Sequence, residues 1–306
     1  MDDNRRRALA ALLGAVLIWS STYVSTKQAI SQVPPGTLAF LRFLLANLVL
    51  LPFYYRDPQR GQGVGWKGLA WMGFTGAFLY FALQNWGLYF TSVSAGSLIQ
   101  GGIPAIIALC SVIFLRERVS AIRAVGIFLS IAGVVGIIMV SGDITGGSRP
   151  FLGNMMMLGS CLAWAAYTML NKRLNLSVNP VTATLGTFFF GMLFMLPLMA
   201  YELKDYHLAL SWLTVGNILY LGVVASALPI FLWNYALLHT DASEAGLYIN
   251  LVPVVSVISA VIFLKETVNL GQIVSGAVVI LGVLVASGIK TGGRSDRLEK
   301  DTRAGD

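Results

Sequence analysis

Long runs without a charged residue constrain this chain more than any other feature. No Asp, Glu, Lys or Arg occurs in 8–26, 43–55, 68–115, 124–142, 150–171, 174–201, 206–240, 245–264 or 267–289. A helix of about 20 apolar residues crosses the hydrocarbon core of a bilayer, because each residue adds about 1.5 Å. The run 68–115 is long enough for two passes, with a polar hairpin around Thr91, Ser92 and Ser94. The sequence therefore predicts an all-α integral membrane protein.

Composition agrees with this prediction. Only 11% of the 306 residues are charged, whereas an average soluble domain has about 25%, and the mean hydropathy is +0.74. The connections between runs are short, so we expect no separate soluble domain. Ten transmembrane helices are predicted, at about 8–27, 36–55, 68–89, 94–115, 121–140, 151–171, 180–201, 212–237, 244–264 and 270–289.

The distribution of Lys and Arg predicts the orientation, because short cytoplasmic loops are enriched in these residues. With the N-terminus inside, the outer segments hold Lys27, Arg149, Lys204 and Lys265. Arg42 lies within a span. The inner segments hold the other 16: Arg5, Arg6, Arg7, Arg56, Arg60, Lys67, Arg116, Arg118, Arg123, Lys172, Arg173, Lys290, Arg294, Arg297, Lys300 and Arg303. We therefore expect both termini to be cytoplasmic, in a multi-pass protein of a bacterial inner membrane.

The sequence also repeats internally. A shift of 145 places Trp19 on Trp164, and a shift of 149 places Asn85 on Asn234 and Pro104 on Pro253. These matches predict two five-helix units, 1–145 and 146–290, followed by a disordered basic tail, 291–306. Because five is odd, the second unit enters the membrane from the opposite side. Inverted repeats around a central cavity are typical of secondary transporters that work by alternating access, although a channel could share the symmetry.

The units carry matching motifs. Their first helices contain Leu17-Ile18-Trp19-Ser20-Ser21 and Cys161-Leu162-Ala163-Trp164-Ala165, and their fourth helices end on Phe114-Leu115-Arg116-Glu117-Arg118 and Phe263-Leu264-Lys265-Glu266-Thr267. In these features, over about residues 8 to 290, the chain resembles the EamA-type ten-helix exporters of the drug/metabolite transporter superfamily, which include YddG-like amino-acid exporters. The resemblance implies export of amino acids or related metabolites through a cavity between the halves, aromatic or hydrophobic amino acids being among the candidates. Nucleotide precursors and drugs are alternatives, because members carry different compounds.

Polar side chains are costly inside a membrane helix, so they tend to face a cavity or the bundle interior. The polar and aromatic side chains on the first, third and fourth helices of one unit and on the sixth, eighth and ninth helices of the chain are candidates for substrate binding. Each amide could instead be a hydrogen bond between helices, which is the commoner role. The candidates are Trp19, Tyr23, Tyr80, Gln84, Asn85, Ser97, Gln100, Trp164, Thr168, Trp233, Asn234 and Asn250.

Three further features concern helix geometry and packing. Pro104 and Pro253 remove a backbone hydrogen bond, so they are hinge candidates or simple kinks. Arg42 lies inside the second span, where a central Arg costs about 3 kcal/mol on insertion scales. We expect it to snorkel outward or pair, or to attract a substrate carboxylate together with Lys27. Pairs of small residues, such as Gly126 with Ser130 and Gly282 with Ala286, predict a close-packing face on the fifth helix and another on the tenth. These helices are expected to be structural, with a dimer contact as one use of such a face, in a monomer or homodimer.

Absent features also narrow the function. All 14 acidic residues lie at helix ends, in loops or in the tails, and proton-driven pumps usually carry Asp, Glu or His inside the membrane. We therefore expect transport without proton coupling. No Walker loop, metal motif or catalytic constellation is present, so we expect neither an enzyme nor a bound metal or cofactor. Anionic lipid accounts for the net charge of +7 without a nucleic acid. The expected partners are a small-molecule substrate and the lipid bilayer.

Overall fold

The computed structural model describes residues 3–58, 65–115, 119–140, 148–174, 180–204, 206, 210–237, 239–240, 245 and 248–287. Every element in these ranges is a helix, which confirms the all-α prediction. The predicted tail, 291–306, lies outside the described residues. In chain order the elements are α1 (Asp3–Ala29), α2 (Pro35–Arg56), α3 (Trp66–Met72), η1 (Gly73–Leu79), α4 (Tyr80–Phe90), α5 (Val93–Gln100), α6 (Ile103–Leu115), α7 (Ala121–Val140), α8 (Pro150–Leu174), α9 (Pro180–Glu202), α10 (Trp212–Leu219), η2 (Tyr220–Val224), α11 (Ala225–Leu237), α13 (Leu251–Leu264) and α14 (Leu270–Ser287).

Two of the predicted long helices contain a π-helical stretch. α3, η1 and α4 continue without a break, because Gly73 and Tyr80 at the junctions keep right-handed helical dihedrals (φ −62°, ψ −41° and φ −59°, ψ −55°). η2 is the corresponding stretch between α10 and α11. In a π-helix the hydrogen bonds join residues five apart, and such stretches often occur near functional sites.

The predicted helix 94–115 is interrupted between α5 and α6. The N–H of Gly102 bonds to the carbonyl of Ile99 at 3.0 Å in a tight turn, and Pro104 follows, with no N–H to donate to the carbonyl four residues earlier. In the other half, α13 begins only at Leu251, so that Pro253 lies in its first turn. Proline is tolerated there because first-turn N–H groups have no partner within the helix. A helix end or break therefore lies beside each hinge candidate.

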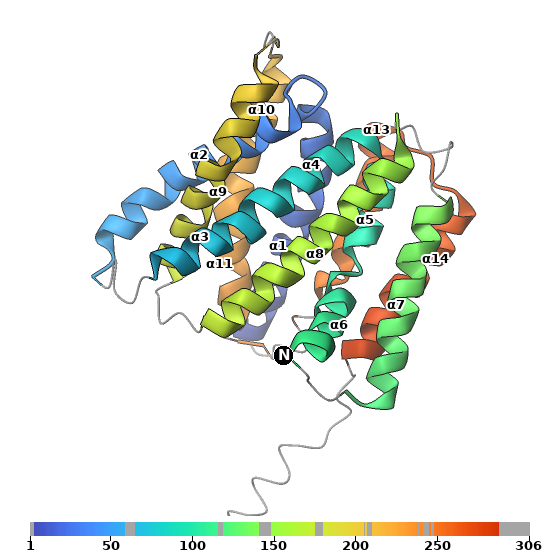
Figure 1. Ribbon diagram of the computed structural model, residues 1–306. Helices are drawn as coiled ribbons and strands as arrows, with labels where there is room; N and C mark the ends of the chain where they lie inside the picture. Colours follow the sequence, from blue (N-terminus) through green and yellow to red (C-terminus); the bar gives the residue numbers. More distant parts are fainter. Residues whose placement is uncertain are drawn as a thin grey trace, which may run out of the picture.

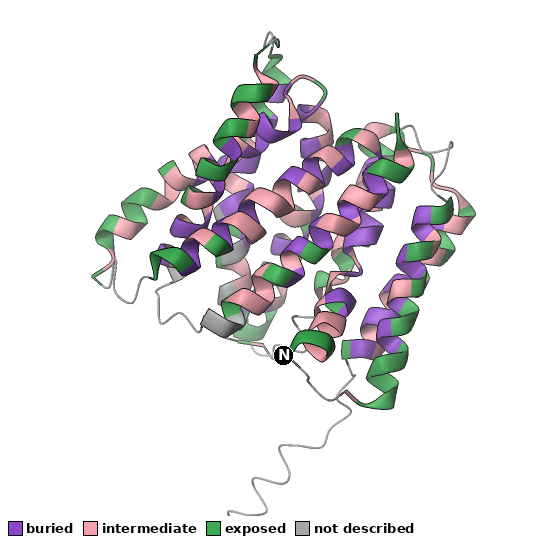
Figure 2. Ribbon diagram, in the orientation of Figure 1, coloured by how far each residue is buried: buried purple, intermediate pink, exposed green. Residues whose placement is uncertain are grey.

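The outer surface is apolar enough for lipid. Six helical segments of the described residues are long and apolar enough to cross a membrane, and Trp212–Val224 and Leu251–Leu264 are shorter apolar helices. Large side chains point outward, with Phe128, Met139 and Leu270 more than 70% exposed, and exposed residues cover the outer faces of the helices (Figure 2). Soluble monomers rarely expose contiguous apolar surface of this extent.

α7 and α14 lie side by side at one edge of the bundle (Figure 1). A Cβ added to Gly133 would lie 2.7 Å from the backbone nitrogen of Val279. One added to Gly282 would lie 2.3 Å from the backbone nitrogen of Ser130. Glycine therefore lets these two backbones approach closely. The small residues predicted to form packing faces on the fifth and tenth helices face one another inside the chain.

Segments far apart in the sequence surround the centre of the bundle. α4 packs on α8, α1 packs on α11 and α13, and α2 packs on α9, as can be followed in Figure 1. The largest buried cluster includes Leu88, Ile99, Met157 and Cys161, which join α4, α5 and α8. This packing fixes the helices that enclose the site described next.

Candidate functional site

A cavity of about 450 Å³ lies among α1, α2, η1, α4, α5, α6, α8, α9, α11, α13 and α14. Small-molecule sites usually enclose about 300–1,000 Å³. The sequence predicts many of its walls: among the lining residues are Trp19, Tyr23, Tyr80, Gln84, Ser97, Gln100, Trp164 and Asn250, together with the hinge candidates Pro104 and Pro253. Residues from both halves of the chain therefore meet at one space.

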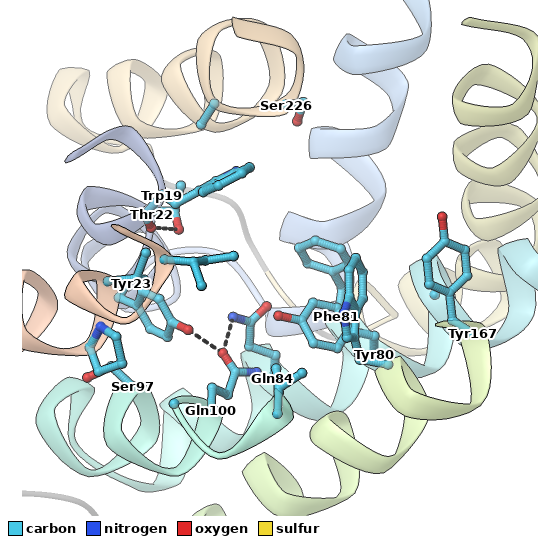
Figure 3. A pocket seen from close by; sticks show the side chains of 18 of the residues that line it. Trp19, Thr22, Tyr23, Tyr80, Phe81, Gln84, Ser97, Gln100, Tyr167 and Ser226 are labelled. Carbon is cyan, nitrogen blue, oxygen red and sulfur yellow. Dashed lines mark hydrogen bonds between the residues drawn. The ribbon is translucent and has the colours of Figure 1, made fainter. Parts of the chain in front are cut away.

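Gln100 is the centre of a polar network in the wall. Its Oε1 accepts from the hydroxyl of Tyr23 and, at 3.1 Å, from the amide of Gln84. Its Nε2 donates to Ser160 Oγ at 2.8 Å. The network joins α1, α4, α5 and α8, and Figure 3 shows Tyr23 and Gln84 converging on Gln100. These amides therefore line the cavity and also hold the helices together.

Aromatic rings form much of the remaining wall. The ring centroid of Trp164 lies 5.0 Å from that of Tyr80 and 5.0 Å from that of Tyr167. Tyr80 also meets Phe81 edge to face at 4.8 Å. Figure 3 shows Trp19 across the cavity from Tyr80 and Phe81. Tilted and edge-to-face pairs are favourable arrangements for aromatic rings, and this wall suits an apolar or aromatic organic molecule.

Arg42 lines the cavity, so its side chain does not take the outward direction that was one of the alternatives left open by the sequence. Its guanidinium carbon lies 4.6 Å from the ring centroid of Phe81, within the range of a cation–π contact. Its Nε donates to Ser226 Oγ over a long 3.4 Å. Phe81 and Ser226 come from other helices and draw the side chain inward. No Asp or Glu is among the described residues that line the cavity.

The model of the EamA-like transporter family matches this chain twice, over residues 6–139 and 151–288. The chain belongs to the EamA-like transporter family. Its membership confirms the resemblance drawn from the sequence motifs, and the protein is a multi-pass membrane transporter of the drug/metabolite transporter superfamily.

Relatives match this EamA-like transporter along most of its length. It is 27% identical to an uncharacterized transporter of Archaeoglobus fulgidus, over 93% of this chain and 98% of the relative. It is 25% identical to a probable terminal-alkyne amino-acid exporter of Streptantibioticus cattleyicolor, over 91% and 93%. It is 28% identical to a probable amino-acid metabolite efflux pump of Salmonella typhimurium, over 92% and 94%.

A crystal structure also resembles this EamA-like transporter. The TM-score is 0.61, the sequence identity is 18%, and the match covers 92% of this chain and 97% of the other. At this identity the likeness concerns the fold alone. It supports the helical arrangement that surrounds the cavity.

Three of the predicted residues whose side chains the structure describes are not among those lining the cavity of this EamA-like transporter. Asn85 is buried, and its Nδ2 donates to the carbonyl of Pro35 at 3.0 Å, which ties α4 to the start of α2. Thr168 donates to the carbonyl of Trp164 in its own helix at 2.8 Å. Trp233 packs against Trp19, with ring centroids 5.5 Å apart. The side chain of Asn234 lies outside the described residues.

The cavity also has residues that the sequence reasoning missed. Thr22 and Tyr167 lie three positions after Trp19 and Trp164, on the same helical face, so helical spacing could have identified them. Thr187 on α9 also lines the cavity, and its buried hydroxyl has no hydrogen-bond partner among the described residues. No pattern in the sequence distinguishes this threonine from the other threonines of the same helix.

Proposed function

We propose that this EamA-like transporter exports amino acids or closely related metabolites, aromatic or hydrophobic ones above all, by alternating access. The observation that carries the proposal is the cavity itself, with aromatic walls and a few buried amides, built from both ranges that match the family. Most of its surface suits an apolar side chain, whereas Gln84, Gln100 and Arg42 offer polar contacts at defined points. Two relatives are named as an amino-acid exporter and an amino-acid metabolite efflux pump.

We also propose that ten transmembrane helices form two inverted five-helix repeats, 1–145 and 146–290. The contacts between α7 and α14 support this arrangement. A Cβ on Gly133 would approach the backbone oxygen of Ser275 at 2.8 Å, and a Cβ on Gly282 would approach that of Gly126 at 2.7 Å. A shift of 149 exchanges these two contacts, as expected for segments related by a two-fold axis. The pairing of α4 with α8 and of α11 with α1 fits the same relation.

The orientation belongs to the proposal as well. The count of 16 Lys and Arg on one side against 4 on the other supports a cytoplasmic position for both termini in a bacterial cell. In this orientation the end of the bundle where α1 ends and α2 begins faces outward. Substrate enters the cavity from the opposite, cytoplasmic end and leaves when the two halves rearrange.

Transport is proposed to run without proton coupling. The described lining residues include no Asp, Glu or His, whereas proton-driven carriers usually hold such groups in the membrane. The substrate then runs down its own gradient or exchanges with another molecule. A pH gradient imposed on proteoliposomes with equal substrate on both sides tests this directly. Net accumulation that an ionophore abolishes would contradict the uncoupled mechanism.

The test of the function is a panel of radiolabelled amino acids, nucleotide precursors and one cationic drug, each measured for flux into proteoliposomes. We expect saturable uptake of at least one hydrophobic or aromatic amino acid, accelerated by the same unlabelled compound preloaded inside. Flux that stays linear to high concentration and shows no counter-flow would indicate a channel. Uptake of nucleotide precursors or the drug alone would reject amino-acid export.

A further inference from the structure

Arg42 is a cation that faces the cavity, and none of the described residues that line this cavity is acidic. It lies seven residues into α2, about 10 Å along the helix axis from Pro35. Among the described residues that line the cavity, it is the one charged side chain. A charged group within a membrane span usually faces a water-filled path, pairs with another group, or marks a substrate pathway. No acidic residue is found among the described lining residues, so pairing does not account for Arg42. A place on a water-filled path or on a substrate pathway fits it better.

The surroundings of Arg42 leave its hydrogen-bonding capacity largely unused. A guanidinium has five N–H donors, and within the described structure only Nε has a hydrogen-bond partner, Ser226 Oγ, at a long 3.4 Å. The ring of Phe81 covers one face of the planar group. The face contact holds the guanidinium, while the four N–H groups on its two Nη atoms have no hydrogen-bond partner in the described structure. The edge of the guanidinium is the part that forms two parallel hydrogen bonds to a carboxylate.

Lys27, near the end of α1, already has hydrogen-bond partners. Lys27 Nζ donates to the carbonyls of Leu88 and Thr91, the latter at 2.7 Å, and it is not among the residues that line the cavity. Lys27 therefore does not line this cavity with Arg42, and a joint role of the two in attracting a substrate stays a prediction. The fork of a single guanidinium matches a carboxylate, which it can hold through two parallel hydrogen bonds.

We propose that Arg42 binds the carboxylate of the transported molecule through the edge of its guanidinium. The apolar body of that molecule then lies against Tyr80 and Trp164. The hydroxyl of Thr187, buried and without a hydrogen-bond partner among the described residues, is a further polar atom on the same cavity. This inference rests on the proposed export of amino acids and names the substrate class more narrowly: small monocarboxylates with an apolar or aromatic side chain.

The test compares L-phenylalanine and L-leucine with L-phenylalaninamide and L-leucinamide, which keep the side chain and amino group but lack the carboxylate. We expect the wild-type protein to transport each amino acid at least ten times faster than its amide at equal concentration. Arg42→Gln should reduce this ratio to near one by slowing the amino acids, and Arg42→Lys should keep part of it. Arg123→Gln is the matched control, because Arg123 bonds to the carbonyl of Ala286, away from the cavity.

The outcomes separate the inference from the function on which it rests. If the wild-type protein transports neither amino acid nor any other amino acid of the panel, the proposed function fails. If it transports amino acids and their amides equally well, the carboxylate site is wrong and the exporter stands. The same conclusion follows if Arg42→Gln keeps the wild-type ratio. If Arg42→Gln fails to fold, it slows the amino acid and its amide alike. The ratio of amino-acid to amide transport in the wild-type protein then decides whether the carboxylate is recognised.

Discussion

Glu266 binds the first turn of α5 through Ser94. Its carboxylate accepts the backbone N–H of Ser94 at 2.9 Å and the hydroxyl of the same residue at 2.7 Å, and it accepts the N–H of Val93 at 2.7 Å. Glu202 does the same at the start of α2, where Thr37 donates its N–H at 2.7 Å and its hydroxyl at 2.9 Å. Each contact joins a carboxylate of the later half to a helix N-terminus of the earlier half, where partial positive charge favours it.

We therefore expect Glu266→Ala to loosen this end of the bundle. A hydrogen bond to a charged group contributes about 1.5–3 kcal/mol, and the substitution removes three such bonds. The apparent melting temperature of the purified protein should fall by several degrees. Lys204→Ala is the control, because this exposed residue at the same end has no side-chain contact of this kind among the described residues. Equal melting temperatures for the two variants would show that the Glu266 carboxylate does not stabilise this end of the bundle.

The close approach of α7 to α14 gives a second prediction. A Cβ at residue 282 would lie 2.3 Å from the backbone nitrogen of Ser130, so Gly282→Ala should destabilise the fold by about 1–3 kcal/mol, as overpacking does. A Cβ at Gly216, inside α10, meets no atom within 4 Å. Gly216→Ala should be neutral or stabilising by up to about 1 kcal/mol, because alanine favours the helix. Thermal unfolding in one detergent measures both. A neutral Gly282→Ala would mean that the two helices can separate at little cost.

The network around Gln100 predicts coupled effects. Gln100→Leu leaves the Tyr23 hydroxyl and the Gln84 amide buried without this partner, which costs about 1–3 kcal/mol per unsatisfied group. We expect lower stability and lower transport. Tyr23→Phe removes the hydroxyl that Gln100→Leu leaves without a partner. The double variant, Tyr23→Phe with Gln100→Leu, should therefore lose less stability than the sum of the two single losses. Additive losses would indicate that Tyr23 and Gln100 act independently.

The aromatic wall predicts an effect on substrate preference. Trp164→Ala removes the ring that contacts Tyr80 and Tyr167, and an aromatic contact contributes about 0.5–1.5 kcal/mol beyond the area it buries. Uptake of an aromatic amino acid should fall about tenfold, with Trp164→Phe intermediate, while insertion in the membrane stays normal. Trp71→Ala is the control, because Trp71 is 60% exposed on the outer surface. Equal transport in both alanine variants would place the substrate elsewhere.

Three single cysteines test the orientation proposed from the charge count. In a background with Cys110 and Cys161 replaced by alanine, cysteines at 61 and 292 should resist a membrane-impermeant reagent added to intact cells, whereas one at 146 should react. Permeabilised cells, in which all three positions should react, are the control. External labelling at 61 or 292 would reverse the orientation and the direction proposed for export.

The sequence by itself determined the membrane environment, the helical class and the positions of most helices, because these depend on local composition. A run without charged residues is apolar whichever segment it packs against. Proline interrupts a helix because its ring removes the backbone N–H, and this does not depend on distant residues. Regular helical spacing also placed Tyr80 with Gln84 on the same helical face, and both line the cavity. The repeat guided the choice of Trp19 and Trp164, since matched positions in two related halves meet the same centre.

Only the tertiary structure decided which polar side chains face the cavity and which fasten one helix to another. Asn85 lies one residue from Gln84, yet it bonds to Pro35 because α2 begins beside it. The depth of Arg42 is readable from the sequence, but its inward direction depends on Phe81 and on Ser226, which is 184 residues away. Contacts between distant segments fix these directions, and helical periodicity carries no information about which distant segment becomes the neighbour.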